Sequence, residues 1–121
     1  MATNSTHSGD YYDLVAQRRF LDEVENGIRM VNREIIHESI PHIDQDRFLK
    51  FAVMVSRLRA SYLAAAFELV DSGAHIPDDG IVADLKAKRE KYDESVAAFD
   101  ALRRAIERGY VDVSKTEPVD D

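Results

Sequence analysis

Cysteine is absent from this chain of 121 residues, and glycine and proline are few, at 5 and 3. Without cysteine the chain can form no disulfide framework, no thiolate metal site and no thiol nucleophile. So few turn-forming residues argue against a strand-rich domain and favour a helical one. No apolar run approaches the roughly 18 residues that a membrane span requires. The absences together indicate a helical protein without a membrane-spanning segment.

The sequence also lacks a signal peptide and an excess of positive charge. The N-terminal stretch MATNSTHSGD has neither the positive nor the apolar region of a signal peptide, so we expect a cytoplasmic protein. The net charge of −7 argues against general binding of nucleic acids. With 45% hydrophobic residues, the chain is long enough for one compact core and one domain.

Apolar residues recur at helical spacing in three segments. They predict helices at about 10–39, 44–71 and 78–108. The links between these segments are short, so neighbouring helices should be antiparallel. The predicted fold is all-α, an antiparallel up-down-up bundle of three long helices. The whole chain then divides into a disordered N-terminal tail at 1–9, a bundle domain at 10–110 and an acidic C-terminal tail at 111–121.

The first predicted helix carries a coiled-coil pattern. Leu14, Leu21, Ile28 and Ile35 fall seven residues apart, at the a position of the heptad. The d positions, three residues after each, hold Gln17, Val24, Val31 and Glu38. This spacing gives one continuous stripe along the helix, which we expect to pack against another helix.

The middle helix is apolar on two sides that lie about 150° apart at ~100° per residue. One side faces its neighbours in the bundle, and the other would remain partly in water. We call the second side the outer seam, and its residues are Leu49, Val53, Ala60, Leu63, Phe67 and Val70. Burying a large apolar side chain contributes about 1.5–3 kcal/mol. We therefore predict a homo-oligomer, most simply a dimer that packs through the central helix. The alternative is a flat monomer whose other helices flank this one.

Basic residues interrupt the apolar pattern of the third predicted helix. Lys88 and Arg89 stand where apolar residues are expected, with Lys86 and Lys91 beside them. One interpretation is a cationic notch for an anionic ligand or an acidic partner. The other is that the long side-chain stems cover apolar surface while the charged ends reach water.

The stretch REIIHESIPHIDQDRF contains the candidate metal ligands Glu34, His37, Glu38 and His42. Glu34 and His37 form an E-x-x-H motif, which places a carboxylate and an imidazole one helical turn apart. In these four residues the chain resembles the ferritin-like superfamily, whose members hold di-iron sites between facing helices. The resemblance implies iron, manganese or zinc at a site shared across a dimer. A second E-x-x-H is missing, and the competing interpretation is a solvated helix end.

Signals for other chemistry are short or missing. The segment HESIP resembles the phosphoacceptor box of dimeric histidine kinases, which would make His37 a phosphotransfer residue, but Pro41 comes one residue early. No glycine-rich phosphate loop or serine elbow is present. We therefore expect a noncatalytic protein-interaction module without a cofactor, such as an adaptor, chaperone-like or regulatory protein, with a protein partner. The alternative is a metal-binding bundle protein or di-iron-type enzyme.

Overall fold

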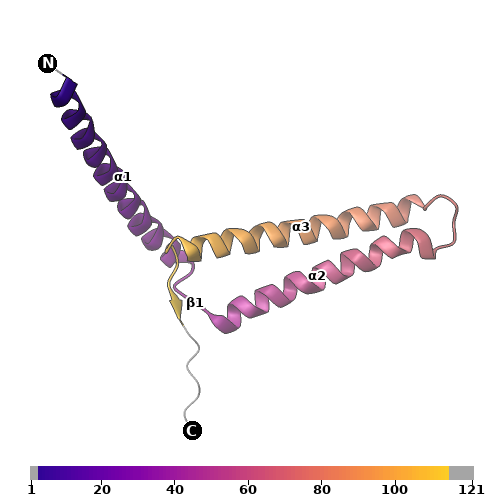
Figure 1. The fold of residues 1–121 in the computed structure, drawn as a ribbon. Coiled ribbons are helices and arrows are strands. Elements are labelled where there is room, and N and C mark those ends of the chain that lie inside the picture. The colour runs from indigo at the N-terminus through magenta and orange to yellow at the C-terminus, as the bar shows by residue number, and fades with distance from the viewer. Residues whose placement is uncertain (1–2, 115–121) are drawn as a thin grey trace, which may run out of the picture.

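A computed structural model describes the backbone of residues 3–114 and the side chains of residues 9–114. It contains the helices α1 (Thr3–Ser39), α2 (Gln45–Asp71) and α3 (Asp79–Glu107) and the two-residue strands β1 (Ile43–Asp44) and β2 (Val113–Ser114). The chain is mostly α-helical, as predicted, and the three helices make up most of the described residues (Figure 1). None of these helices combines the length and the apolarity that crossing a membrane requires.

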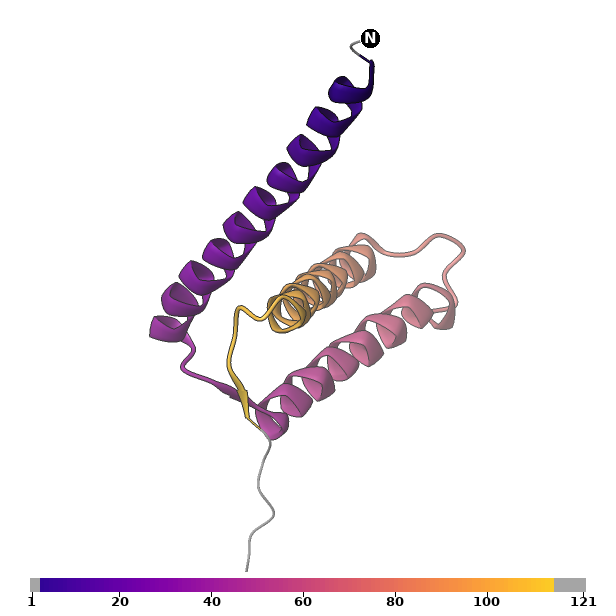
Figure 2. The ribbon, with the colours of Figure 1, turned by 60° about the vertical axis from the view of Figure 1, so that its left-hand side comes forward.

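The helices α2 and α3 lie side by side as an antiparallel hairpin (Figures 1 and 2). The Asp44 side chain accepts a hydrogen bond of 2.7 Å from the backbone N–H of Arg47 and so caps the start of α2. Just after α2, Gly73 adopts a φ of 73°, a left-handed conformation that glycine tolerates without strain. Asp78 caps the start of α3 through the N–H of Gly80. These local signals set the ends of both helices where the sequence predicted them, within one residue.

Aromatic contacts hold the hairpin together along the side of α2 that faces α3. The ring of Phe99 lies 4.9 Å from that of Phe48 and 5.7 Å from that of Phe51, measured between centroids. Farther toward the tip, Tyr62 stacks on Tyr92 at 5.8 Å. Aromatic pairs at such distances add to the stability that comes from area burial alone. The inner side of α2 therefore packs against α3, as the sequence predicted for its inner residues.

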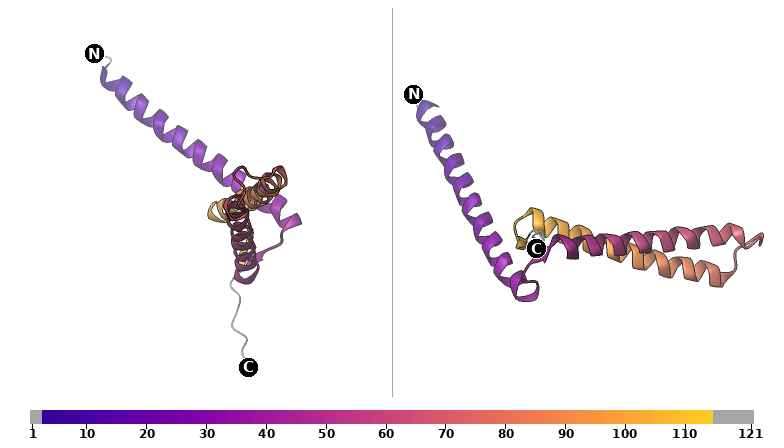
Figure 3. Two further views of the ribbon diagram at one scale, coloured as in Figure 1. Left: turned by 90° about the vertical axis from the view of Figure 1, so that its right-hand side faces the viewer. Right: turned by 90° about the horizontal axis from the view of Figure 1, so that it is seen from below.

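The third helix does not complete a bundle within the single chain. α1 meets the hairpin only at its C-terminal end and then points away from it (Figures 1 and 3). The predicted up-down-up arrangement is therefore seen only in its α2–α3 half. α1 also begins at Thr3, whereas we expected a disordered tail as far as residue 9.

The segment after α3 turns back instead of trailing away. β2 pairs in parallel with β1, and the N–H of Ile43 donates a hydrogen bond of 2.9 Å to the carbonyl of Asp112. Ile43 and Val111 are 4% and 7% exposed, among the most buried residues of the described chain. The predicted acidic tail at 111–121 is thus corrected for residues 111–114, because Val111 has an apolar pocket to fill; residues 115–121 lie outside the described part.

The chain buries little of its surface. Its accessible area is 10036 Å², whereas a compact protein of 13.7 kDa has about 6,600 Å². In residues 9–114, the buried apolar residues are Ile43, Val55, Ala65 and Val111. Much of the apolar surface of α1 and α2 therefore faces water in the single chain.

Candidate interaction surface

The outer seam of α2 is exposed along its whole length. Leu63, Phe67 and Val70 are 53%, 67% and 75% exposed, and Leu49 and Val53 are also exposed. Ala60 lies between them and is exposed as well. The helix presents these residues because its other side is occupied by the contacts with α3. The structure thus brings the predicted seam residues onto one open face of the hairpin.

A second apolar strip runs along α1. We call it the α1 stripe, and its exposed members are Leu14, Leu21, Val24, Ile28, Val31 and Ile35. Their spacing of seven, three and four residues places them on one side of the helix. Leu14, near the far end, is 65% exposed. The chain therefore carries two separate apolar helix faces, and neither is covered.

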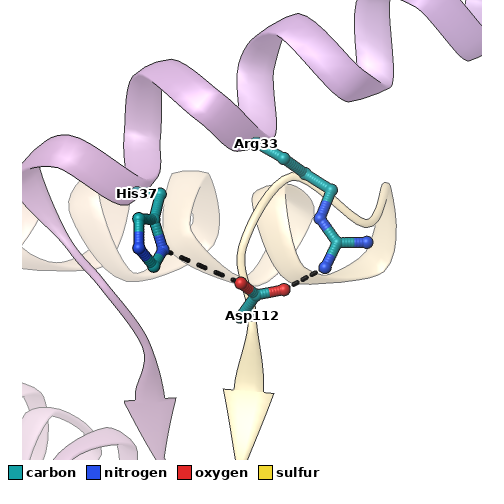
Figure 4. Close-up of polar contacts among 3 residues, drawn as sticks. All are labelled: Arg33, His37 and Asp112. Atoms are coloured by element: carbon teal, nitrogen blue, oxygen red, sulfur yellow. Dashed lines mark hydrogen bonds and ion pairs between the residues drawn. The ribbon is translucent and has the colours of Figure 1, made fainter.

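A polar cluster fixes the direction of α1 at the joint with the hairpin. Arg33 of α1 forms an ion pair with Asp112, and His37 Nδ1 lies 3.8 Å from the other carboxylate oxygen of Asp112 (Figure 4). One turn earlier, Arg29 Nε donates a hydrogen bond of 3.1 Å to the carbonyl of Arg108. Gly109 lies against the Arg29 side chain, where an added Cβ would sit 3.2 Å from Arg29 Cδ. The joint thus relies on contacts between segments 79 residues apart.

Apolar residues fill the space beneath this cluster. An open cavity at the joint is lined by residues of all three helices, among them Ile36, Ile40, Phe48, Phe51, Leu102 and Ala105. Ile36 comes from the last turn of α1 and Ile40 directly follows the helix, so that end of α1 packs on the hairpin even though the rest leaves it. Polar contacts and apolar packing together hold α1 in its outward direction.

The candidate metal ligands lie at this same joint, but they do not form a coordinating group. Glu34, His37, Glu38 and His42 are all exposed. His37 is directed to Asp112, and the carbonyl of His42 accepts a hydrogen bond from Arg47 at 3.3 Å. Among the residues that the structure describes, no three His, Asp or Glu side chains gather closely enough to hold a metal ion.

The four basic residues predicted as a cationic notch lie on the first half of α3, near the tip of the hairpin. Lys86, Arg89 and Lys91 are exposed, and Lys88 is half-buried. Lys88 Nζ forms an ion pair of 2.9 Å with Asp84 one turn earlier. The charge of Lys88 is therefore paired with a carboxylate on its own helix, and the cationic notch stays a prediction.

Comparison with known proteins adds no assignment to these surfaces. No protein-family model matches the chain, and neither the curated proteins nor the solved structures give a match.

Sequence reasoning missed the joint. Arg29, Arg33 and Asp112 hold α1 in place, yet none of them belongs to a recognisable sequence motif. The one available signal was Val111 and Val113 within a polar stretch, since apolar residues at alternate positions are typical of a short strand. That signal marks β2 but not its partner.

Proposed function

We propose that the protein is a noncatalytic protein-interaction module, a small cytoplasmic adaptor or regulatory protein that self-associates through the outer seam of α2. The observation that supports this is the exposure of Leu63, Phe67 and Val70 in the single chain. Soluble monomers rarely expose apolar patches larger than a few hundred Å² unless the patch binds something. The α1 stripe adds a second such surface on the same chain.

The free energy available from covering these surfaces is large. Fully burying one such side chain contributes about 1.5–3 kcal/mol. Three residues of the outer seam, each more than half exposed, therefore offer several kcal/mol per chain before the costs of association. A dimer forms only when such gains exceed the loss of translational and rotational freedom. The twofold arrangement doubles each contact, which favours self-association over binding of one unrelated ligand.

Light scattering coupled to size-exclusion chromatography tests self-association. The purified chain should elute with twice its mass of 13.7 kDa, over a range of micromolar concentrations. The substitution Leu63→Asp places a charge on the outer seam and should shift the protein toward the monomer. Lys50→Gln, on an exposed flank of α2 away from the outer seam, changes the charge by the same amount and should leave the mass unchanged. A wild-type monomer at every concentration would contradict the proposal.

Elemental analysis of the same preparation, purified without a histidine tag, tests the metal-binding alternative. We expect iron, manganese and zinc far below one atom per chain, because the four candidate ligands do not converge. Stoichiometric metal that is lost on His37→Ala would favour the alternative and displace the proposal of a noncatalytic module.

A further inference from the structure

We infer that the α1 stripe of one chain packs antiparallel along the outer seam of a second copy, and that the second copy returns the same contact. This inference rests on the proposed self-association and names the surface that covers the seam. Such an exchange closes on itself, because two identical contacts related by a twofold axis leave no free copy of either surface. The product is a dimer in which each hairpin receives its third helix from its partner.

The two strips match in length. The α1 stripe extends from Leu14 to Ile35 and the outer seam from Leu49 to Val70, and each covers 21 residue steps. At 1.5 Å per residue, both are about 32 Å long. A helix laid along the seam would therefore cover it from end to end.

The two strips also match in spacing, and over their full length they do so in the antiparallel direction. Along α1 the intervals between stripe positions run three, four, three, four from Leu14, with Gln17 as the second position. Along α2 they run four, three, four, three from Leu49, with Ser56 as the third position. All seven positions agree when α2 is taken backwards from Val70, whereas the parallel direction aligns six positions after a shift of one. In antiparallel coiled coils, a positions of one helix meet d positions of the other. Each a position of α1 then meets a d position of α2.

This register produces seven consecutive layers. They are Leu14 with Val70, Gln17 with Phe67, Leu21 with Leu63, Val24 with Ala60, Ile28 with Ser56, Val31 with Val53, and Ile35 with Leu49. Large and small side chains face each other at Val24 with Ala60 and at Ile28 with Ser56, which lets the two helices approach closely. Each of the two polar residues, Gln17 and Ser56, faces an apolar side chain across its layer. Five of the seven layers are wholly apolar.

The joint explains why the α1 that covers the outer seam comes from another copy. The same layers would form within one chain only if α1 swung back about the link at residues 40–44. The contacts of Arg29 with Arg108 and of Arg33 with Asp112 instead hold α1 pointing away from its own hairpin (Figures 3 and 4). In that direction the α1 stripe is available to a second hairpin.

The uncovered area is sufficient for a stable dimer. The accessible surface exceeds that of a compact protein of this mass by about 3,400 Å² per chain. Stable interfaces bury about 1,200–2,000 Å² in total, and obligate dimers more. Covering even a third of the excess on each of two chains would reach that range.

Charge also favours the antiparallel direction. Residues 10–25 of α1 carry five acidic and two basic side chains, a net charge of −3. In the inferred dimer this acidic half lies at the tip of the partner's hairpin, where α3 begins. Residues 84–91 of α3 carry four basic and two acidic side chains, a net charge of +2. Attraction between them orients the helices and adds modestly to affinity.

Engineered cysteines test the inference, and the absence of native cysteine makes the result unambiguous. Two full-length variants are prepared, Leu21→Cys with a size tag and Leu63→Cys without one, and they are mixed and oxidised. Both positions are exposed in the single chain, so the substitutions leave the hairpin intact. We expect a mixed disulfide as the main product, since a disulfide needs Cα atoms within about 7 Å. Val15→Cys, on the far side of α1 and away from the joint, replaces Leu21→Cys as the control and should give little mixed product.

The other products separate the failure of this inference from the failure of self-association. A dimer by light scattering that forms only Leu21→Cys homodimers or only Leu63→Cys homodimers would overturn the inferred pairing but leave self-association intact. A double variant carrying both cysteines that links within one chain, at monomer mass, would overturn both. The pair Val24→Cys with Ala60→Cys repeats the test one layer away, and failure of both pairs in a proven dimer would also overturn the inferred register.

Discussion

The substitution Phe67→Ala separates the strength of association from the stability of the fold. Phe67 is 67% exposed in the single chain and has α3 on the other side of its helix, so the hairpin loses little when the ring is removed. In a dimer that covers the outer seam, two such rings become buried. The substitution should therefore weaken the dimer and leave the isolated chain almost unchanged.

The size of the effect follows from the exposed fraction. Full burial of a phenylalanine side chain contributes about 1.5–3 kcal/mol, and about two thirds of that, or roughly 1–2 kcal/mol, is still available at Phe67. The twofold axis doubles this to about 2–4 kcal/mol per dimer. Since 1.4 kcal/mol corresponds to a factor of ten, the dissociation constant should rise by roughly 30- to 700-fold.

Sedimentation equilibrium at several protein concentrations measures that constant for wild type and variant. Thermal unfolding at a concentration where both proteins are monomeric should show melting temperatures within a few degrees of each other. If Phe67→Ala leaves the dissociation constant within a factor of about three of wild type, the ring is not buried on association and the reasoning fails. An equal loss of monomer stability would show instead that the ring packs within its own chain.

Four further substitutions test the fold and the joint. Gly109→Ala and Gly73→Ala share a positive φ, of 75° and 73°, so urea unfolding should show a loss of about 1–2 kcal/mol for each. Gly109→Ala should lose more, because its new Cβ meets an α1 side chain whereas that at Gly73 meets nothing; equal losses would contradict the close contact at the joint. Phe99→Ala should cost about 3 kcal/mol in the same assay, the low end for a core phenylalanine since its ring is only half-buried, and a loss below about 1 kcal/mol would contradict the aromatic packing. Asp112→Asn should cost no more than about 1 kcal/mol, since its ion pair with Arg33 is largely exposed, while spin labels on α1 and α3 should report a broader distance distribution; an unchanged distribution would show that the pair does not orient α1.

The α2–α3 hairpin could be predicted almost completely from the sequence. Its helix ends follow from local signals, namely the caps at Asp44 and Asp78 and the left-handed glycine at position 73. Local signals act within a few residues, so they do not depend on the rest of the fold. The inner side of α2 was also predictable, because its apolar spacing matches that of α3.

The direction of α1 could not be predicted in the same way. Heptad spacing shows which side of a helix is apolar, but it does not show whether the covering helix belongs to the same chain. Here the direction depends on Asp112, whose partner Arg33 is 79 residues away. Such a pairing has no periodic signature, and an aspartate in an acidic segment is easily taken for part of a tail.

The outer seam could also be predicted from the sequence, whereas the outcome at the E-x-x-H motif could not. The outer seam was predictable because a helix with two apolar sides needs two neighbours, and α3 supplies only one of them. The E-x-x-H motif at Glu34 and His37 places two side chains one turn apart, but further ligands must come from other segments. Only the tertiary structure decides that, and in the described residues it gathers no group of three such side chains that could hold a metal ion.

Isotope-filtered nuclear Overhauser spectra test the central claim most directly. Equal amounts of ¹³C-labelled and unlabelled chains are mixed, unfolded and refolded together, so that contacts between two copies are detected separately from those within one copy. The exchanged dimer predicts cross-peaks between the methyl groups of Leu21 in one chain and Leu63 in the other. The same cross-peaks seen only within a single chain would contradict it, because α1 would then lie on its own hairpin.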